Sequence, residues 1–315
     1  MKQYVDLLFK ILTTGEKRED RTGVGTLSVF GGQVEFDLQE RFPLVTIKET
    51  RWKIAFLEML WFLRGESNTK FLKENGSSLW DPWADKDGNL GPIYGVQWRK
   101  WPGKLKEHLT RVVTEDALNT PSENFDYTKY GTFVGSRYDT DQHEDISIYQ
   151  ESVDQIKVLL ELIKTQPRGR RHIVTAWNPA FLKDMGLPPC HRDFHCYVSN
   201  DGHLDLMMGI RSWDTVLGGP FNIAQYALFT HLIARATDLK PRRLIITYGD
   251  AHIYLNHVDL IWKIINEKIP IRDERWIKTE LIFKTDNRDI DGYKIEDFDI
   301  LGYKSHPFMK FPIAV

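Results

Sequence analysis

The sequence predicts an α+β fold, because its expected helices and strands follow one another without regular βαβ alternation. Two segments, residues 52–63 and 221–236, are apolar on nearly every side and long enough to be core helices. We expect 221–236 to be a central buried helix packed against a mixed β-sheet. With 315 residues, the chain can bury a sizeable core without disulfides or metals. We therefore expect one large domain over 1–315.

Apolar side chains recur at helical spacing in three other segments. An N-terminal stripe that includes Tyr4 is expected to form a helix ending at Gly15. A second helix is expected over 153–163, stopped near Pro167, and a third over 259–266.

Short or alternating apolar runs predict the strands. Residues 26–30 and 33–38 indicate a strand pair around two glycines. The other expected strands are 172–177, 194–199, 203–208, 244–247 and 279–284. Residues 103–150 are instead polar and rich in turn formers, which predicts a surface insertion in which we find no chemistry.

Composition excludes several classes of protein. The formal net charge of −2 argues against bulk nucleic-acid binding, and 42% hydrophobic with 27% charged residues excludes a disordered chain. No run approaches the ~18 apolar residues of a membrane span, and the N-terminus lacks the pattern of a signal peptide. The two cysteines, Cys190 and Cys196, would lie ~20 Å apart on an extended segment, too far for a disulfide. We therefore expect a cytoplasmic protein with free thiols.

Glu58 is an unusual residue within the apolar run 52–63. Its ionised form would be costly in a core without partners. The side chain either occupies one solvent-facing stripe of the helix or is a carboxylate kept in a pocket to hold water and move protons.

The sequence PPCH at 188–191 holds a cysteine at the mouth of an expected strand. A thiolate is suited to attack a soft, conjugated carbon, and nearby cations would lower the pKa of the thiol from ~8.5. The alternative is a small buried apolar side chain. A zinc site of Cys190, His191, His195 and Cys196 is disfavoured, because there is no CxxC pair and the ligands would crowd onto seven consecutive residues.

Arginines and a serine lie beside expected strands or in a glycine-containing loop, at Arg21, Arg168, Arg170, Arg171, Arg211 and Ser212. Guanidinium groups with a hydroxyl suit a phosphate dianion. The alternative is a set of solvated surface charges.

The segment GDAHIY at 249–254 carries two polar rings. If it is extended, His252 and Tyr254 point the same way, as two groups that hydrogen-bond a sugar would. The alternative is a structural histidine beside a tyrosine with its own partner.

Taken together, these segments resemble the thymidylate synthase family over essentially the whole chain except 103–150. The matching motifs are DRTGVGT, FPLVTIK, LEMLWFLRGESN, LWDPWA, GPIYGVQWR, RRHIVTAWNP, LPPCH, RS followed by D, LGGPFNIAQYAL, GDAHIYLNH and the terminal PIAV. One tetrapeptide would prove little, whereas this many in this order are very specific.

The resemblance implies a homodimer, packed sheet to sheet, that transfers and reduces a one-carbon unit from 5,10-methylenetetrahydrofolate to C5 of dUMP, giving dTMP and dihydrofolate. Cys190 would add to C6 of the uracil ring, and Glu58 would organise proton transfers through water. Tyr94 would lie near the reacting carbon. The partners would be dUMP and a reduced folate, with no metal, membrane or DNA.

The resemblance also assigns binding residues. Phosphate would be held by Arg21, Arg211 and Ser212, with Arg170 and Arg171 supplied by the partner subunit, and the 3′-hydroxyl by His252 and Tyr254. Asn222 would read uracil, because an amide donates to O4 while accepting from N3–H; an aspartate there would favour cytosine. The folate contacts would be Trp80, Trp83, Asp214, Leu217, Gly218 and Phe221, closed over by Ala314 and Val315.

The chain departs from the family pattern at four positions. Ile210 replaces a glutamine, Trp213 replaces a small residue at the expected folate edge, and His195 and Cys196 follow PPCH in place of the usual pattern. The alternative activity is therefore a dUMP hydroxymethylase, in which water instead of hydride captures the methylene intermediate and gives 5-hydroxymethyl-dUMP and tetrahydrofolate. A non-catalytic nucleotide-binding protein is less favoured, because Cys190, Glu58 and Asn222 are all present.

Overall fold

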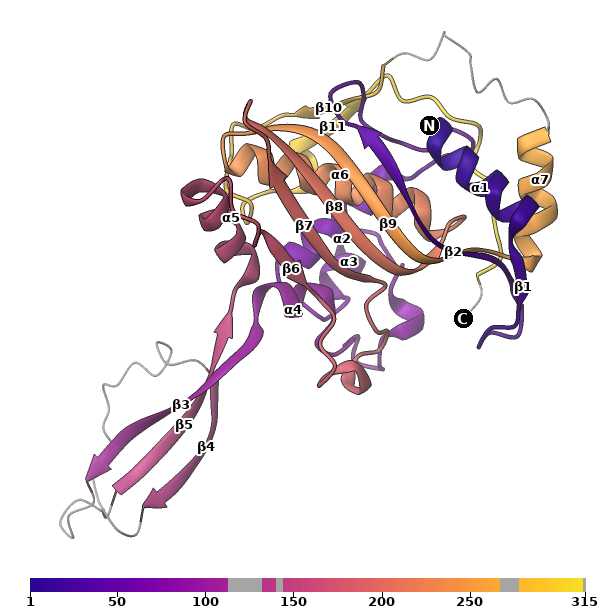
Figure 1. Cartoon of the computed structure of the whole chain (residues 1–315). Helices are drawn as coiled ribbons and strands as arrows, with labels where there is room; N and C mark the ends of the chain where they lie inside the picture. The colour runs from indigo at the N-terminus through magenta and orange to yellow at the C-terminus, as the bar shows by residue number, and fades with distance from the viewer. Residues whose placement is uncertain (113–131, 140–143, 267–277, 314–315) are drawn as a thin grey trace.

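A six-stranded mixed sheet with helices against one face forms the body of the molecule (Figure 1). The computed structural model describes residues 1–112, 132–139, 144–266 and 278–313. In sheet order the strands are β1 (Glu16–Arg18), β2 (Thr26–Asp37), β9 (Lys240–Tyr254), β8 (His203–Asp214), β7 (His191–Val198) and β6 (Ile173–Thr175). Only β8 and β9 pair in parallel within this sheet, so the expected mixed sheet is confirmed.

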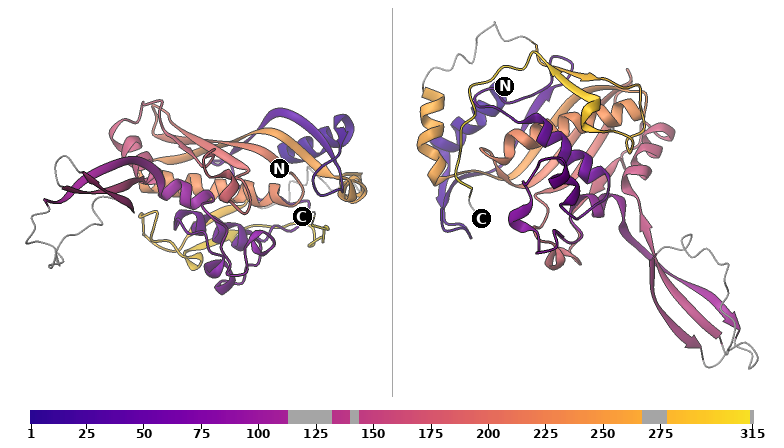
Figure 2. Two further views of the ribbon diagram at one scale, coloured as in Figure 1. Left: turned by 90° about the horizontal axis from the view of Figure 1, so that it is seen from below. Right: turned by 180° about the vertical axis from the view of Figure 1, so that it is seen from behind.

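The central buried helix is α6 (Gly218–Ala236), which connects β8 to β9. A helical crossover of this kind returns the chain to the same end of the sheet, which is why these two strands run parallel. On its other side α6 packs against α2 (Trp52–Leu63), which is buried along most of its length. Both expected core helices are therefore confirmed, and α3 (Lys70–Glu74) and α4 (Tyr94–Arg99) complete this helical layer (Figure 2).

The amphipathic helices cover the edges of the body. They are α1 (Lys2–Thr14), α5 (Gln155–Thr165) and α7 (Val258–Asn266), close to the expected bounds. The body also contains β10 (Glu280–Phe283) paired with β11 (Phe298–Leu301), and the 3₁₀ helices η1 (Asp81–Trp83), η4 (Leu182–Asp184), η5 (Leu255–His257) and η6 (Ile295–Asp297). Within the described residues, no helix is both long and apolar enough to cross a bilayer.

The expected strand pair around the two glycines is wrong, because β2 is one continuous strand. It pairs with the long strand β9 from Thr26 to Asp37. Gly31 has a φ of +80°, which lets the strand kink without turning back. A Cβ atom at Gly32 would lie 2.3 Å from the hydroxyl of Tyr248, so this position has room only for glycine unless the ring moves.

The segment expected as a polar insertion contains an antiparallel sheet that projects from the body (Figures 1 and 2). Its order is β3 (Trp101–Val112), β5 (Glu144–Val153) and β4 (Thr132–Asp139). These strands were not predicted, because their sequences lack a clear alternation of apolar and polar residues. The rest of 103–150 lies outside the described residues.

Candidate active site

Cys190 lies immediately before β7, at the edge of the helical face of the sheet, and is partly exposed. The backbone N–H of Cys190 donates to the hydroxyl of Tyr94 at 2.8 Å, and the backbone N–H of Arg211 donates to the Cys190 carbonyl at 2.8 Å. These two bonds tie the cysteine to α4 on one side and to β8 on the other.

Cations of the same chain act on the Cys190 thiol, but they are not the largest influence on its pKa. Burial raises the pKa of the thiol, and the opposing charges of Arg211 and Arg21 do not overcome it. Both arginines are nevertheless close enough to act on the sulfur. Within one chain burial is therefore the larger influence on this thiol, and activation of the sulfur by cations stays a prediction.

Contacts connect Cys190 with Glu58. The ring of Tyr94 packs edge-on against Trp80, with ring centroids 5.7 Å apart. The indole Nε1–H of Trp80 donates to Oε1 of Glu58 at 2.5 Å, and the Nε2 amide of Gln225 donates to Oε2. Glu58 is 7% exposed, so it does not occupy a solvent-facing stripe of α2.

Glu58 combines burial with neutral donors. Burial raises the pKa of its carboxyl to about 7, and the two hydrogen bonds from Trp80 and Gln225 oppose this rise only in part. A carboxyl that titrates near neutral pH can both accept and release a proton, as a general acid–base group must. Burial therefore argues against the solvent-facing alternative, and the role of Glu58 in moving protons stays a prediction.

Asn222 lies one turn into α6, partly buried, on the side of the helix that carries Gln225. Its Nδ2 amide donates to Oε1 of Gln225 at 3.3 Å. Asn222 also lies beside His191, whose pKa is lowered to about 4 by burial and raised slightly by this amide. His191 is therefore a neutral neighbour of the candidate base-reading residue.

Sequence reasoning did not single out Gln225, although it is fully buried and joins Asn222 to Glu58. The same signal that marked Glu58, a polar side chain within an apolar helix, could have found it.

Sequence reasoning also missed Lys48. Burial lowers the pKa of its amine to about 8, and the negative charge of Asp214 opposes this shift. Lys48 and Asp214 therefore lie near each other.

Arg211 is fixed by the proline pair that precedes the cysteine. Its Nε and one terminal nitrogen donate to the carbonyls of Pro189 and Pro188 at 2.9 and 2.8 Å. Arg21 is exposed in a loop shaped by Asp20, whose carboxylate accepts from the backbone of Thr22 and Gly25.

His252 and Tyr254 lie side by side on β9, with ring centroids 5.4 Å apart, as their spacing predicted. The Nδ1 atom of His252 is 2.8 Å from Oδ1 of Asp250. Burial raises the pKa of Tyr254 to about 12, with further contributions from Asp214 and Cys190, so this tyrosine lies within electrostatic reach of the site.

Asp214 shapes the turn from β8 into α6. Its Oδ1 accepts from the backbone N–H groups of Val216 and Leu217 at 2.9 and 3.0 Å. Three of the expected folate contacts, Leu217, Gly218 and Phe221, are partly buried at this end of α6, as is Trp83 beside Trp80. Ala314 and Val315 lie outside the described residues.

Arg170 and Arg171 are not brought to Cys190 within one chain. Both are exposed and precede β6, where Ile173 pairs with His195. Continuing that register puts Arg171 level with Tyr197, roughly 23 Å along β7 from Cys190. Ser212 lies on β8 directly after Arg211, and both side chains are partly buried; their part in a phosphate site stays a prediction.

The four departures from the family pattern lie in the sheet. Ile210 and Cys196 are buried core residues, whereas His195 lies on the outer face of the sheet. Because two of the four suggested zinc ligands, His195 and Cys196, lie on opposite faces, the zinc interpretation gains no support. No group of metal-ligating side chains occurs among the described residues. Trp213 is fully buried and packs towards Tyr248 and towards Gly219, which follows the expected folate contact Gly218, so its closeness to the folate edge stays a prediction.

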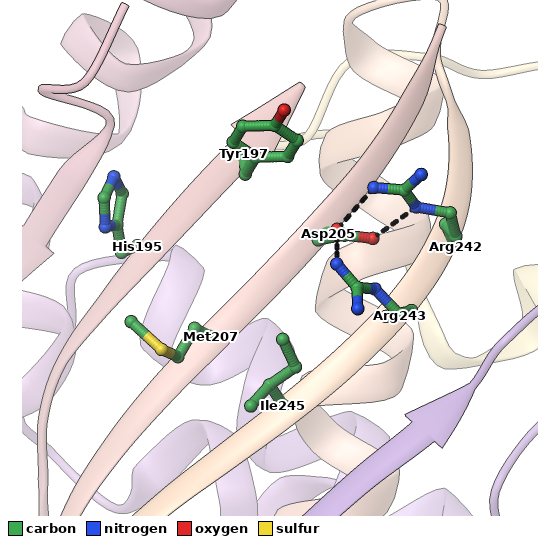
Figure 3. A pocket seen from close by; sticks show the side chains of 7 residues that line it. All are labelled: His195, Tyr197, Asp205, Met207, Arg242, Arg243 and Ile245. Atoms are coloured by element: carbon green, nitrogen blue, oxygen red, sulfur yellow. Dashed lines mark hydrogen bonds and ion pairs between the residues drawn. The ribbon is translucent and has the colours of Figure 1, made fainter. Parts of the chain in front are cut away.

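A separate hollow of about 370 Å³ lies on the outer face of the sheet, which carries no helices (Figure 3). Asp205 and the guanidinium groups of Arg242 and Arg243 line it, together with Ile245. None of the residues assigned to catalysis or binding lies there, so this hollow is not the candidate active site.

The comparison with known proteins agrees with this geometry. A family model described as thymidylate synthase matches residues 2–315, essentially the whole chain. The expected recognition is thereby confirmed, and with it an enzyme that transfers a one-carbon unit from methylenetetrahydrofolate to dUMP. The chain belongs to the thymidylate synthase family.

Proposed function

We propose that the protein converts dUMP to dTMP, with 5,10-methylenetetrahydrofolate supplying both the one-carbon unit and the hydride. The observation that carries this proposal is the unbroken set of contacts from Cys190 through Tyr94 and Trp80 to Glu58. It joins a nucleophile to a carboxyl whose pKa is about 7.

In this proposal the Cys190 thiol gives its proton to solvent water, and the thiolate bonds to C6 of uracil. The electron pair of the C5–C6 double bond moves towards C5 and O4, which makes C5 a carbon nucleophile. After C5 has bonded to the one-carbon unit, its proton leaves through water held by Glu58. Expulsion of tetrahydrofolate creates an exocyclic methylene, and hydride completes the methyl group while the sulfur departs from C6. Tyr94 keeps Cys190 in place throughout.

The nucleotide would be held by groups on three elements. Arg21 and Arg211 with Ser212 supply cations and a hydroxyl for the phosphate, and His252 and Tyr254 present polar atoms for the 3′-hydroxyl. Asn222 supplies an amide for O4 and N3–H. The half-buried apolar side chains at the start of α6 and Trp83 fit a flat folate ring.

The competing outcome is capture of the methylene by water, as in a dUMP hydroxymethylase. Mass analysis of the nucleotide product from dUMP and methylenetetrahydrofolate separates the two. We expect a methyl group at C5 together with dihydrofolate; a hydroxymethyl group with tetrahydrofolate would assign the alternative. A 5-fluoro analogue of dUMP should also become bonded to Cys190, and binding without bonding would favour a non-catalytic protein.

We also infer a homodimer in which the outer faces of the two sheets pack together. The register aligns Ile173, His195 and Met207 on that face, and the exposed ring of Tyr197 lies beside them. Exposed apolar groups on a helix-free sheet face favour burial by a second copy. The two free cysteines fit a reducing compartment such as the cytoplasm.

Substitution of Asn222 tests how the base is read. Asn222→Asp should shift preference from dUMP towards dCMP by about tenfold or more, because a carboxylate accepts from the exocyclic amine of cytosine. Competition assays with both nucleotides measure the shift. Unchanged selectivity would show that another residue reads the base.

A further inference from the structure

Among the described residues, Gln225 is the one side chain with hydrogen bonds to both Glu58 and Asn222. It is fully buried on α6, where an amide without partners would be costly. Its Nε2 group faces the Glu58 carboxylate and its Oε1 atom faces the Nδ2 group of Asn222.

The orientation of each amide is set by the hydrogen-bonding group that it faces, beginning at Glu58 and continuing through Gln225 to Asn222. An ionised carboxylate only accepts hydrogen bonds, so it requires the NH₂ end of Gln225. The oxygen of Gln225 must then face Asn222, and this requires the NH₂ end of Asn222. Reversing either amide would place two acceptors against each other and leave a buried polar atom without a partner.

The direction of the Asn222 amide matters because uracil and cytosine present opposite patterns. Uracil has an acceptor at O4 and a donor at N3, whereas cytosine has a donor at N4 and an acceptor at N3. An asparagine that could turn over freely would match either base. In the orientation fixed by Gln225, one Nδ2 proton remains for O4 and a lone pair of Oδ1 for N3–H, with neutral His191 as a further hydrogen-bonding neighbour of this amide.

We propose that Gln225 is a positioning residue that transmits the acceptor character of the Glu58 carboxylate to Asn222 and thereby makes the site selective for uracil. This inference rests on the proposed function. It adds a role for a residue to which no nucleotide contact was assigned, and it connects base selectivity to the charge of the Glu58 carboxylate.

The connection makes selectivity dependent on pH. When Glu58 is protonated it can donate, so Gln225 and then Asn222 can turn over. The titratable groups of the described residues that interact with the charge of Glu58 are Tyr94 on α4 and Tyr226 on α6, and burial raises the pKa of both well above the ordinary value. Neighbouring His191 stays neutral, because burial lowers its pKa to about 4.

The test compares wild type with Gln225→Met, which keeps the length of the side chain and removes both polar ends. Calorimetric titration gives the ratio of dissociation constants for dCMP and dUMP without folate. We expect this ratio to fall by about tenfold or more in Gln225→Met. In wild type this ratio should also fall as the pH is lowered through about 7, in a range where cytosine remains neutral. In the variant the ratio should not change with pH.

Thr230→Val is the matched control, since Thr230 is equally buried on α6 but bonds only to the backbone of Tyr226. It should keep the wild-type ratio and pH dependence. If Gln225→Met does not fold, Gln225→Asn retains an amide too short to span both partners, and it should show the same loss.

The outcomes separate this inference from the proposed function. Suppose that wild type prefers dUMP to dCMP and that a folded Gln225 variant shows the same preference with the same pH dependence. This result overturns the role of Gln225 and leaves the proposed function standing. A wild-type protein that binds dUMP no better than dCMP overturns the assignment of uracil as well.

Discussion

Two buried carboxylates on opposite sides of the sheet have opposite properties. On the helical side, Glu58 is 7% exposed and accepts only from the neutral groups of Trp80 and Gln225. On the outer side, Asp205 is 3% exposed and accepts from the guanidinium groups of Arg242 and Arg243 at 2.6 to 2.8 Å (Figure 3).

The difference shows that partners, more than burial, decide what a buried acid can do. Burial pushes the pKa of both carboxyls up; at Asp205 the hydrogen bonds and charges of the two arginines overcome it and lower the pKa, whereas at Glu58 the pKa remains raised to about 7. Asp205 therefore stays ionised and stabilises the fold. Glu58 can exchange a proton, as catalysis requires.

The largest expected effect is on the helical side, at Cys190. Cys190→Ser should lower turnover of dUMP by roughly a thousandfold or more, because a hydroxyl is a far weaker nucleophile towards a conjugated carbon. Steady-state kinetics and the loss of covalent 5-fluoro-dUMP adduct measure this. Cys196→Ala, in the buried part of β7, is the control and should keep most activity. Substantial turnover by Cys190→Ser would remove the proposed nucleophile.

Substituting each carboxylate by its amide tests the comparison directly. Glu58→Gln should lower kcat by about a hundredfold or more, as loss of a general acid–base group does. Asp205→Asn should leave kcat near wild type and lower the free energy of unfolding by about 2 kcal/mol, less than a fully buried pair loses because both guanidinium groups reach solvent. Kinetics and denaturant unfolding of both variants measure the contrast. If Asp205→Asn proved the more damaging to kcat, the assignment of roles would be reversed.

The sequence predicted the core helices, and it drew attention to Glu58 and Cys190, because those features are local. An apolar run such as 52–63 identifies a helix by itself, and Glu58 is conspicuous within it. The continuity of β2 could not be predicted in this way, because it depends on pairing with a strand that lies over two hundred residues away. The upward shift of the Cys190 pKa by burial could not be predicted for a related reason: neighbouring arginines are visible in a sequence, but the depth of burial is not.

The two carboxylates should also act oppositely on stability as the pH changes. Because the folded pKa of Glu58 is raised, the folded protein binds this proton more tightly than the unfolded chain. Stability from this group is therefore greatest at low pH and falls between pH 4.5 and about 7, by up to about 3 kcal/mol. Because the folded pKa of Asp205 is lowered, its contribution is present above its unfolded pKa of about 4 and is lost at lower pH.

Denaturant unfolding across this pH range tests the direction in which the stability contributions of Glu58 and Asp205 change with pH. The difference in stability between wild type and Glu58→Gln should change between pH 5 and about 7 and be constant above it. The difference between wild type and Asp205→Asn should change only in more acidic solution. A constant difference for Glu58→Gln over the whole range would mean that its folded pKa is ordinary.

The smallest expected effect concerns the outer side of the sheet. In the proposed dimer, Arg170 and Arg171, which precede β6, would reach the active site of the partner subunit. Arg170→Ala and Arg171→Ala should each raise the KM for dUMP by about tenfold, as loss of a charge-assisted hydrogen bond does. Arg168 is an exposed neighbour in the same loop, so Arg168→Ala is the control and should leave the KM for dUMP unchanged.

Mixing two variants tests whether these arginines act across the dimer. In an equal mixture of Arg171→Ala and Cys190→Ser chains, half of the dimers contain one chain of each variant. Each of these has one intact site, so about a quarter of wild-type activity should return at low dUMP. Activity equal to the sum of the separate variants would mean that each site is built within one chain, and that the outer face serves the fold without serving the reaction.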